Sequence, residues 1–124
     1  MQTYTIVHRI DDLSKEISDK LEAALKQANR IRNDENPEVV FVIGGDGTFL
    51  YAVHKYIDKI ESLGTIVIQG KYLLEIVRKL PEGLINIEII DGLKILINSQ
   101  NSNFNLNGID PNEFPNINLE NSIN

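Results

Sequence analysis

The sequence predicts an α/β fold with a Rossmann-like, mainly parallel sheet, in the order βαβαβα followed by a β-hairpin. Short β-prone runs alternate with longer stretches in which apolar residues recur at helical spacing, and such alternation is typical of parallel sheets with helical crossovers. One run, Val39 to Ile43, is continuously apolar and ends at glycines, as central parallel strands do. Asp91-Gly92 stands between two further apolar runs, which is the pattern of a tight hairpin turn.

The first strand and helix follow from residues near the N-terminus. Thr3 to Val7 is short and β-prone, and Asp11 and Asp12 come next as candidate helix caps. Apolar residues then recur at helical spacing, which predicts an amphipathic helix with the core positions Leu13, Ile17, Leu21, Ala24, Leu25 and Ala28. Polar residues and a proline from Asn33 to Pro37 end this pattern before the apolar run.

The remaining elements are predicted by the same reasoning. Apolar residues between Leu50 and Leu63 indicate a second helix, and Thr65 to Ile68 a third strand that ends at Gly70. Tyr72 to Leu80 predicts a third helix, since Pro81 and Gly83 stop it. The two hairpin strands are expected at 84–90 and 93–97.

A change of composition divides the chain into two parts. Ten of the 27 residues from Asn98 onward are Asn, and no Lys or Arg follows Lys94. A segment of this kind buries too little apolar surface to offset its chain entropy. We therefore expect one α/β domain over residues 1–97 and an irregular, flexible Asn-rich tail over residues 98–124.

Composition and charge exclude several classes of function. With 124 residues and 42% hydrophobic content the chain suits one soluble domain. A net charge of -6 argues against nucleic acid as a partner, because nucleic-acid binding relies on clustered Lys and Arg. The absence of cysteine and the isolated positions of His8 and His54 predict no metal site. No apolar run approaches the length of a membrane span, so a cytoplasmic protein without a membrane partner is expected.

The loop Gly44-Gly45-Asp46-Gly47-Thr48-Phe49-Leu50 carries the candidate chemistry. It joins a buried strand to a helix N-terminus, where unpaired N–H groups favour ligands at the carboxyl end of a sheet. Glycines let a ligand approach the backbone closely, and the single carboxylate, Asp46, suits a sugar hydroxyl whose proton it can accept. In the alternative interpretation the glycines only satisfy the geometry of the turn and Asp46 only caps the helix.

At these residues the chain resembles the NAD kinase family, especially its Gram-positive bacterial members. The shared pattern comprises Asn36-Pro37-Glu38, an apolar strand, Gly44 to Thr48 and the helix start Phe49-Leu50. The resemblance implies ATP-dependent phosphorylation of the adenosine ribose 2′-hydroxyl of NAD to give NADP. It makes NAD and ATP substrates, with Mg²⁺ accompanying the phosphoryl donor. It also implies that Asp46 is the catalytic base and that the nucleotide is bound by Gly44, Gly45, Asp46, Gly47, Thr48 and Phe49.

Two alternatives stay open beside that resemblance. Lipid kinases related to diacylglycerol kinase share the Gly-Gly-Asp-Gly-Thr core, although Phe49-Leu50-Tyr51 follows it here instead of their usual Asn-Glu pair. The family's Thr-Gly-x-Leu-Gly-Phe loop and its second domain have no counterpart before Asn124. A non-catalytic or degenerate nucleotide-binding module is therefore the other hypothesis, and an exposed sheet edge would favour a homo-oligomer.

Overall fold

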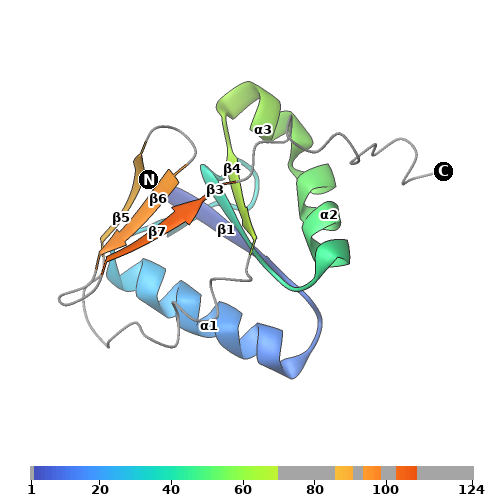
Figure 1. Ribbon diagram of the computed structural model, residues 1–124, viewed down its shortest axis with the longest axis horizontal. Coiled ribbons are helices and arrows are strands. Elements are labelled where there is room, and N and C mark those ends of the chain that lie inside the picture. Colours follow the sequence, from blue (N-terminus) through green and yellow to red (C-terminus); the bar gives the residue numbers. More distant parts are fainter. Residues whose placement is uncertain (1, 70–85, 91–93, 99–102, 109–124) are drawn as a thin grey trace.

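A four-stranded parallel sheet forms the centre of the molecule. The computed structural model describes residues 2–69, 86–90, 94–98 and 103–108 (Figure 1). The strands are β1 (Thr3–His8), β2 (Ile31–Arg32), β3 (Val39–Ile43) and β4 (Ile66–Gln69), and they lie in the order β2-β1-β3-β4. The predicted α/β class with a mainly parallel sheet is confirmed.

Strand β3 occupies the middle of this sheet because its five residues are all apolar. It pairs in parallel with β1 on one side and with β4 on the other, and each of its residues is buried. A strand covered on both faces needs apolar side chains at every position, not at alternate ones. The unbroken apolar run therefore predicted both the strand and its central place.

Helix α1 (Asp12–Gln27) covers one face of the sheet. Its N-cap is Asp11, as expected, whose carboxylate accepts a hydrogen bond from the Ser14 amide at 2.7 Å. Ile17, Leu21 and Leu25 enter one core cluster with β1, β3 and β4, whereas the predicted core residue Leu13 is 54% exposed. Leu13 therefore lies outside the core, although it belongs to the same apolar period.

The opposite face is covered by two helices, where the sequence predicted one. Helix α2 (Asp46–Lys55) and helix α3 (Ile57–Leu63) are separated by Tyr56, whose backbone is not helical, at φ -108° and ψ 14°. Tyr56 is buried in a second core cluster with Val40, Val42 and Phe49. The apolar period across the break is nearly continuous, so it does not reveal the change of helix axis.

A second sheet is antiparallel and contains β5 (Asn86–Ile90), β6 (Lys94–Asn98) and β7 (Asn103–Asn107), in that order. The predicted antiparallel pairing of the first two is confirmed, although Ile90 pairs with Lys94, so that three residues separate them where a two-residue turn was expected. Ile97 is fully buried in the core cluster of α1, and Phe104 packs against that cluster. This sheet therefore shares the α1 side of the parallel sheet.

Strand β7 gives regular structure to part of the segment that was expected to be irregular from residue 98. Asn103–Asn107 pairs with β6 over five residue pairs, including Ile97 with Phe104. The alternation of Asn with Phe104 and Leu106 is a strand pattern, and the Asn content hid it. Residues 109–124, the predicted helix over 72–80 and the hairpin turn at 91–92 lie outside the described residues.

No helix in the described part of the chain combines the length and the apolar character that crossing a bilayer requires.

Candidate functional site

The predicted loop connects the end of β3 to the start of α2. Gly44 has φ +153°, and a Cβ there would lie 2.6 Å from Thr48 Oγ1 and 3.1 Å from Arg9 Cβ. A side chain at Gly44 is therefore excluded by both conformation and space. At Gly45 and Gly47 an added Cβ meets nothing within 4 Å. Of the three glycines in the loop, the fold itself requires Gly44.

The predicted ligand-binding residues differ in how far they reach solvent. Gly45, Asp46 and Gly47 are exposed, and Gly44 and Thr48 are half-buried. Gly45 is the N-cap of α2, and Asp46 lies in the first turn, where a carboxylate interacts favourably with the helix dipole. Phe49 is 5% exposed and packs in the second core cluster, so its side chain belongs to the core and not to the exposed surface of the loop.

Topology places this loop beside the turn between β1 and α1. Helices α1 and α2 cover opposite faces of the sheet, and the strands that precede them, β1 and β3, are neighbours (Figure 1). The strand that follows β1 in the chain and later pairs with it, β2, lies on one side of the β1–β3 pair, and β4, which follows β3, lies on the other. The point between β1 and β3 is therefore the switch point of the sheet. Their carboxyl ends are held together where the Arg9 amide donates to the Ile43 carbonyl at 2.8 Å. Ligands of open α/β sheets bind at such a switch point.

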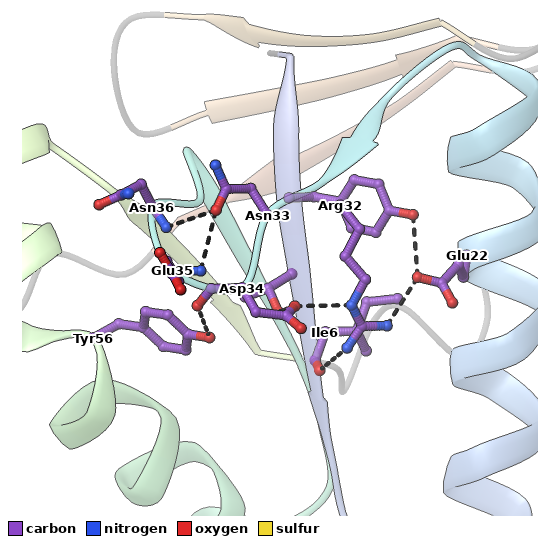
Figure 2. A network of polar contacts seen from close by, with 10 residues as sticks. Ile6, Glu22, Arg32, Asn33, Asp34, Glu35, Asn36 and Tyr56 are labelled. Atoms are coloured by element: carbon purple, nitrogen blue, oxygen red, sulfur yellow. Dashed lines mark hydrogen bonds and ion pairs between the residues drawn. The ribbon is translucent and has the colours of Figure 1, made fainter.

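A second polar cluster, which the sequence analysis did not identify, lies at the β2 edge of the sheet (Figure 2). Arg32 Nη1 lies 2.8 Å from Glu22 Oε2 on α1, and Arg32 Nε lies 2.8 Å from Asp34 Oδ1. Thr5 donates its hydroxyl to the same Asp34 oxygen at 2.6 Å. The hydroxyl of Tyr4 donates to Glu22 Oε2 at 3.2 Å. The cluster joins α1, β1 and the loop after β2.

The pKa values of the acids in this cluster follow from those contacts. The hydrogen bond from Thr5, followed by that from Arg32, lowers the pKa of the Asp34 carboxyl. Burial raises the pKa of the Glu22 carboxyl, but the hydrogen bond and charge of Arg32 outweigh it and leave the pKa below its ordinary value. Both acids are thus held ionised against one guanidinium, as a structural ion pair requires.

The sequence contained a weak sign of this cluster. Arg32 precedes the Asn33–Pro37 break and Asp34 lies within it, two residues further on, which favours a local contact. Asn33 shapes the turn, since its side-chain oxygen accepts from the amides of Glu35 and Asn36 at 3.1 and 2.9 Å. The partner on α1, Glu22, is ten residues away from Arg32, and no local pattern identifies it.

Within residues 2–69 and the described strands of the second sheet, no three His, Asp or Glu side chains gather where they could hold a metal ion.

Comparison with known proteins gives one family match over most of the chain. The family model described as "DNA polymerase III beta subunit, N-terminal domain" matches residues 6–118. The beta sliding clamp of Halalkalibacterium halodurans is 46% identical over 59 residues, which cover 48% of this chain and 16% of that protein. The beta sliding clamp of Staphylococcus epidermidis is 25% identical over 114 residues, or 88% of this chain and 30% of that protein.

NAD kinases also match part of the chain. The NAD kinase of Staphylococcus carnosus is 36% identical over 92 residues, which cover 72% of this chain and 34% of that protein. The chain thus spans 16% to 34% of the length of these three relatives.

The family match corrects the expected membership of the NAD kinase family. It extends over residues 6–118, including the Gly44–Leu50 loop, so that loop alone does not identify the family. The expectation of a phosphotransferase that uses NAD, ATP and Mg²⁺ is wrong, because the matching family is that of a polymerase subunit, the sliding clamp. The connection between a strand and a helix sets the conformation of such a loop. The same seven residues can therefore occur in proteins with different functions.

The expected partners are corrected by the same match. Small-molecule nucleotides as partners and the exclusion of nucleic acid conflict with a family named for a DNA polymerase subunit. The exclusion rested on a net charge of -6 for the whole chain. The net charge is a sum over the whole chain and does not give the charge of any one surface. It therefore does not exclude contact with DNA at one part of a larger assembly.

Proposed function

Because the chain belongs to the family of the DNA polymerase III beta subunit, N-terminal domain, we propose that it forms part of a DNA sliding clamp rather than an enzyme. In this function it keeps a DNA polymerase on its template and contacts DNA and polymerase as partners. The observation that carries the proposal is the family match over residues 6–118. A bacterial replication component of this kind would act in the cytoplasm.

The charge of the chain is compatible with a clamp that slides. Each ion pair with a phosphate holds a protein at one place on DNA and releases a counterion, so tight binding demands many Lys and Arg. A clamp retained around DNA needs few such pairs. The net charge of -6 therefore fits mobile retention better than static binding.

One chain supplies only a fraction of such an assembly. The clamp of Halalkalibacterium halodurans is matched over 16% of its length and that of Staphylococcus epidermidis over 30%. We propose that further domains or further copies complete the clamp. Within the chain, residues 1–97 would form the main domain, and strand β7 of the following segment adds to its second sheet.

The test is an extension assay on primed circular single-stranded DNA with bacterial DNA polymerase III and the full-length beta sliding clamp of Halalkalibacterium halodurans. Excess purified chain is expected to shorten the products, because it competes for polymerase or enters mixed assemblies. Direct binding of the chain to immobilised polymerase and to the clamp is measured in parallel. Unchanged products together with no binding to either protein would overturn the proposal.

Asp46→Asn serves as a matched control in this assay. Asp46 is exposed in the first turn of α2, and the substitution keeps its shape while removing its charge. A clamp function that does not use the loop predicts equal inhibition by the variant and by the original chain. Loss of inhibition in a folded variant would place the loop in the contact with polymerase.

We also propose that the loop at the switch point binds a small polar molecule through Gly44, Gly45, Asp46, Gly47, Thr48 and the Phe49 backbone. Its position between β1 and β3 favours this role. Titration with ribose 5-phosphate is expected to shift the amide resonances of Gly45 to Thr48, and less so in Asp46→Asn. Equal shifts with inorganic phosphate would indicate an anion effect at the helix terminus, and no shifts would overturn the proposal.

A further inference from the structure

The two sheets of the chain belong to two bodies that lie on either side of Gln69 in the sequence. The parallel sheet is built entirely from residues 2–69, and helices from the same residues cover both of its faces. The second sheet is built from β5, β6 and β7, and no pairing between described strands joins it to the first (Figure 1). Residues 2–69, the first body, thus hold the layers and the core that a compact unit needs.

The described contact between the two bodies is apolar and lies on the α1 side of the parallel sheet. Ile97 of β6 is buried in the α1 core cluster, and its ladder partner Phe104 packs against that cluster. Within the first body, by contrast, the parallel ladders are continuous, and the Ile66 amide extends one of them by donating to the Glu38 carbonyl at 3.0 Å. Regions joined by few buried contacts open separately more readily than regions joined by a ladder.

Similarity to the beta sliding clamps is concentrated in about half of the chain. The clamps of Halalkalibacterium halodurans and Bacillus subtilis are 46% and 41% identical over 59 and 63 residues, which cover 48% and 51% of the chain. Over 114 residues the identity to the Staphylococcus epidermidis clamp is only 25%. Because the identity nearly halves as the matched length nearly doubles, the added residues contribute few identical positions.

The glycine loop indicates which half carries that similarity. The pattern shared with NAD kinases, Asn36 to Leu50, lies in the first body. NAD kinases match 70 to 92 residues of the chain at 30% to 36% identity. This similarity assigns no reaction to the chain, but it shows that the first body contains sequence of another character. The half most similar to the clamps is then the one that holds the second sheet.

We propose that residues 2–69 form a separately unfolding unit, and that contact with DNA polymerase is made by the body that holds β5, β6 and β7. The second part of this proposal rests on the proposed clamp function. The glycine loop and the polymerase contact are then built on different bodies, so a ligand at the loop and the polymerase do not compete for one surface.

Hydrogen exchange of the full chain in increasing urea tests the division into two units. The amides of β1, β3 and β4 are expected to lose protection at one urea concentration and those of β5 and β6 at another. Gly44→Ala, in the first body, should lower only the first concentration. Leu96→Ala, at a half-buried position of β6, should lower only the second. If Gly44→Ala leaves the first body unfolded in water, Tyr56→Phe is the milder substitution in that body.

A single transition shared by all strands, and lowered alike by Gly44→Ala and Leu96→Ala, would refute the separate units. This measurement involves neither DNA nor polymerase, so its result is independent of the clamp function.

Exchange with and without bacterial DNA polymerase III locates the partner contact. Polymerase is expected to slow the exchange of amides in β5, β6 or β7 and to leave residues 2–69 unchanged. Ribose 5-phosphate, the probe of the loop, should act only on the first body. Slower exchange within residues 2–69 on addition of polymerase would place the contact on the wrong body and contradict the proposal. No binding of polymerase would contradict the clamp function together with this contact, whereas the two units are decided by the urea experiment alone.

Discussion

The Tyr56 hydroxyl donates a hydrogen bond to the Asp34 carbonyl oxygen at 2.7 Å. Tyr56 stands at the break between α2 and α3, and Asp34 lies in the loop between β2 and β3. Tyr56 is 3% exposed, so its ring is part of the core while its polar end holds a loop. The contact ties the helices of one face to the edge of the sheet that carries Arg32 (Figure 2).

Replacing Tyr56 with Phe tests the strength of this tie. The ring and its packing remain, but the Asp34 carbonyl loses its donor, so the free energy of unfolding should fall by about 0.5–1.5 kcal/mol. Urea denaturation followed by circular dichroism measures the change. Tyr51→Phe is the matched control, because Tyr51 is 54% exposed, and it should leave the free energy nearly unchanged. Equal effects of the two substitutions would contradict the prediction.

Gly44 and Gly47 are expected to respond to alanine with opposite signs. Gly44→Ala places a Cβ 2.8 Å from Thr48 Cβ at a backbone φ of +153°. The free energy of unfolding should therefore fall by about 2–4 kcal/mol. In Gly47→Ala the new Cβ meets nothing within 4 Å, and alanine favours the helix by up to about 1 kcal/mol. Thermal unfolding of both variants gives the comparison. A stable Gly44→Ala protein would show that the loop adopts another conformation.

Thr65 supplies a buried hydrogen bond before β4. Its hydroxyl donates to the Pro37 carbonyl at 2.7 Å, and the residue is 4% exposed. Thr65→Val keeps the shape but leaves that carbonyl without its donor, which should cost about 1–3 kcal/mol. Ser62→Ala, which removes an exposed hydroxyl bonded to Asp58, should change the stability by less than about 0.5 kcal/mol. Urea unfolding distinguishes the two, and a neutral Thr65→Val would count against this hydrogen bond.

The Tyr4 phenol predicts a loss of stability in strong base. Burial, and after it the charge of Glu22, raises the pKa of Tyr4 to about 12 from an ordinary value of 10.0. The pKa of Tyr4 is thus higher in the folded state than in the unfolded state. The contribution of the protonated phenol to the free energy of unfolding is therefore fully present below pH 10 and is lost as the pH rises toward 12.

The measurement is the free energy of unfolding across this pH range for the original chain and for Tyr4→Phe. The difference in the free energy of unfolding between the two proteins should narrow above pH 10. In an ultraviolet titration, the variant should lack the one tyrosine that ionises only near the raised pKa. If the difference does not change with pH, Tyr4 has the same pKa in the folded and the unfolded state, which would contradict the prediction.

Local patterns were sufficient for much of the fold. The strands at Thr3–His8 and Val39–Ile43, the Asp11 cap and the helix after it are written in neighbouring residues, because periodicity and capping act over a few positions. The Gly44–Leu50 loop was likewise located correctly between a strand and a helix. Its family was not, since the longer match over residues 6–118 belongs to the polymerase subunit.

The sequence by itself therefore determined the α/β class, the central strand and the place of the glycine loop. Tertiary structure alone decided the two-residue strand β2 and the helix break at Tyr56, and it paired β7 of the Asn-rich segment with β6. It also joined Arg32 to Glu22 and Ile6. These features depend on contacts between residues far apart in the chain. Such contacts stabilise the fold only after the sheet has brought those residues together.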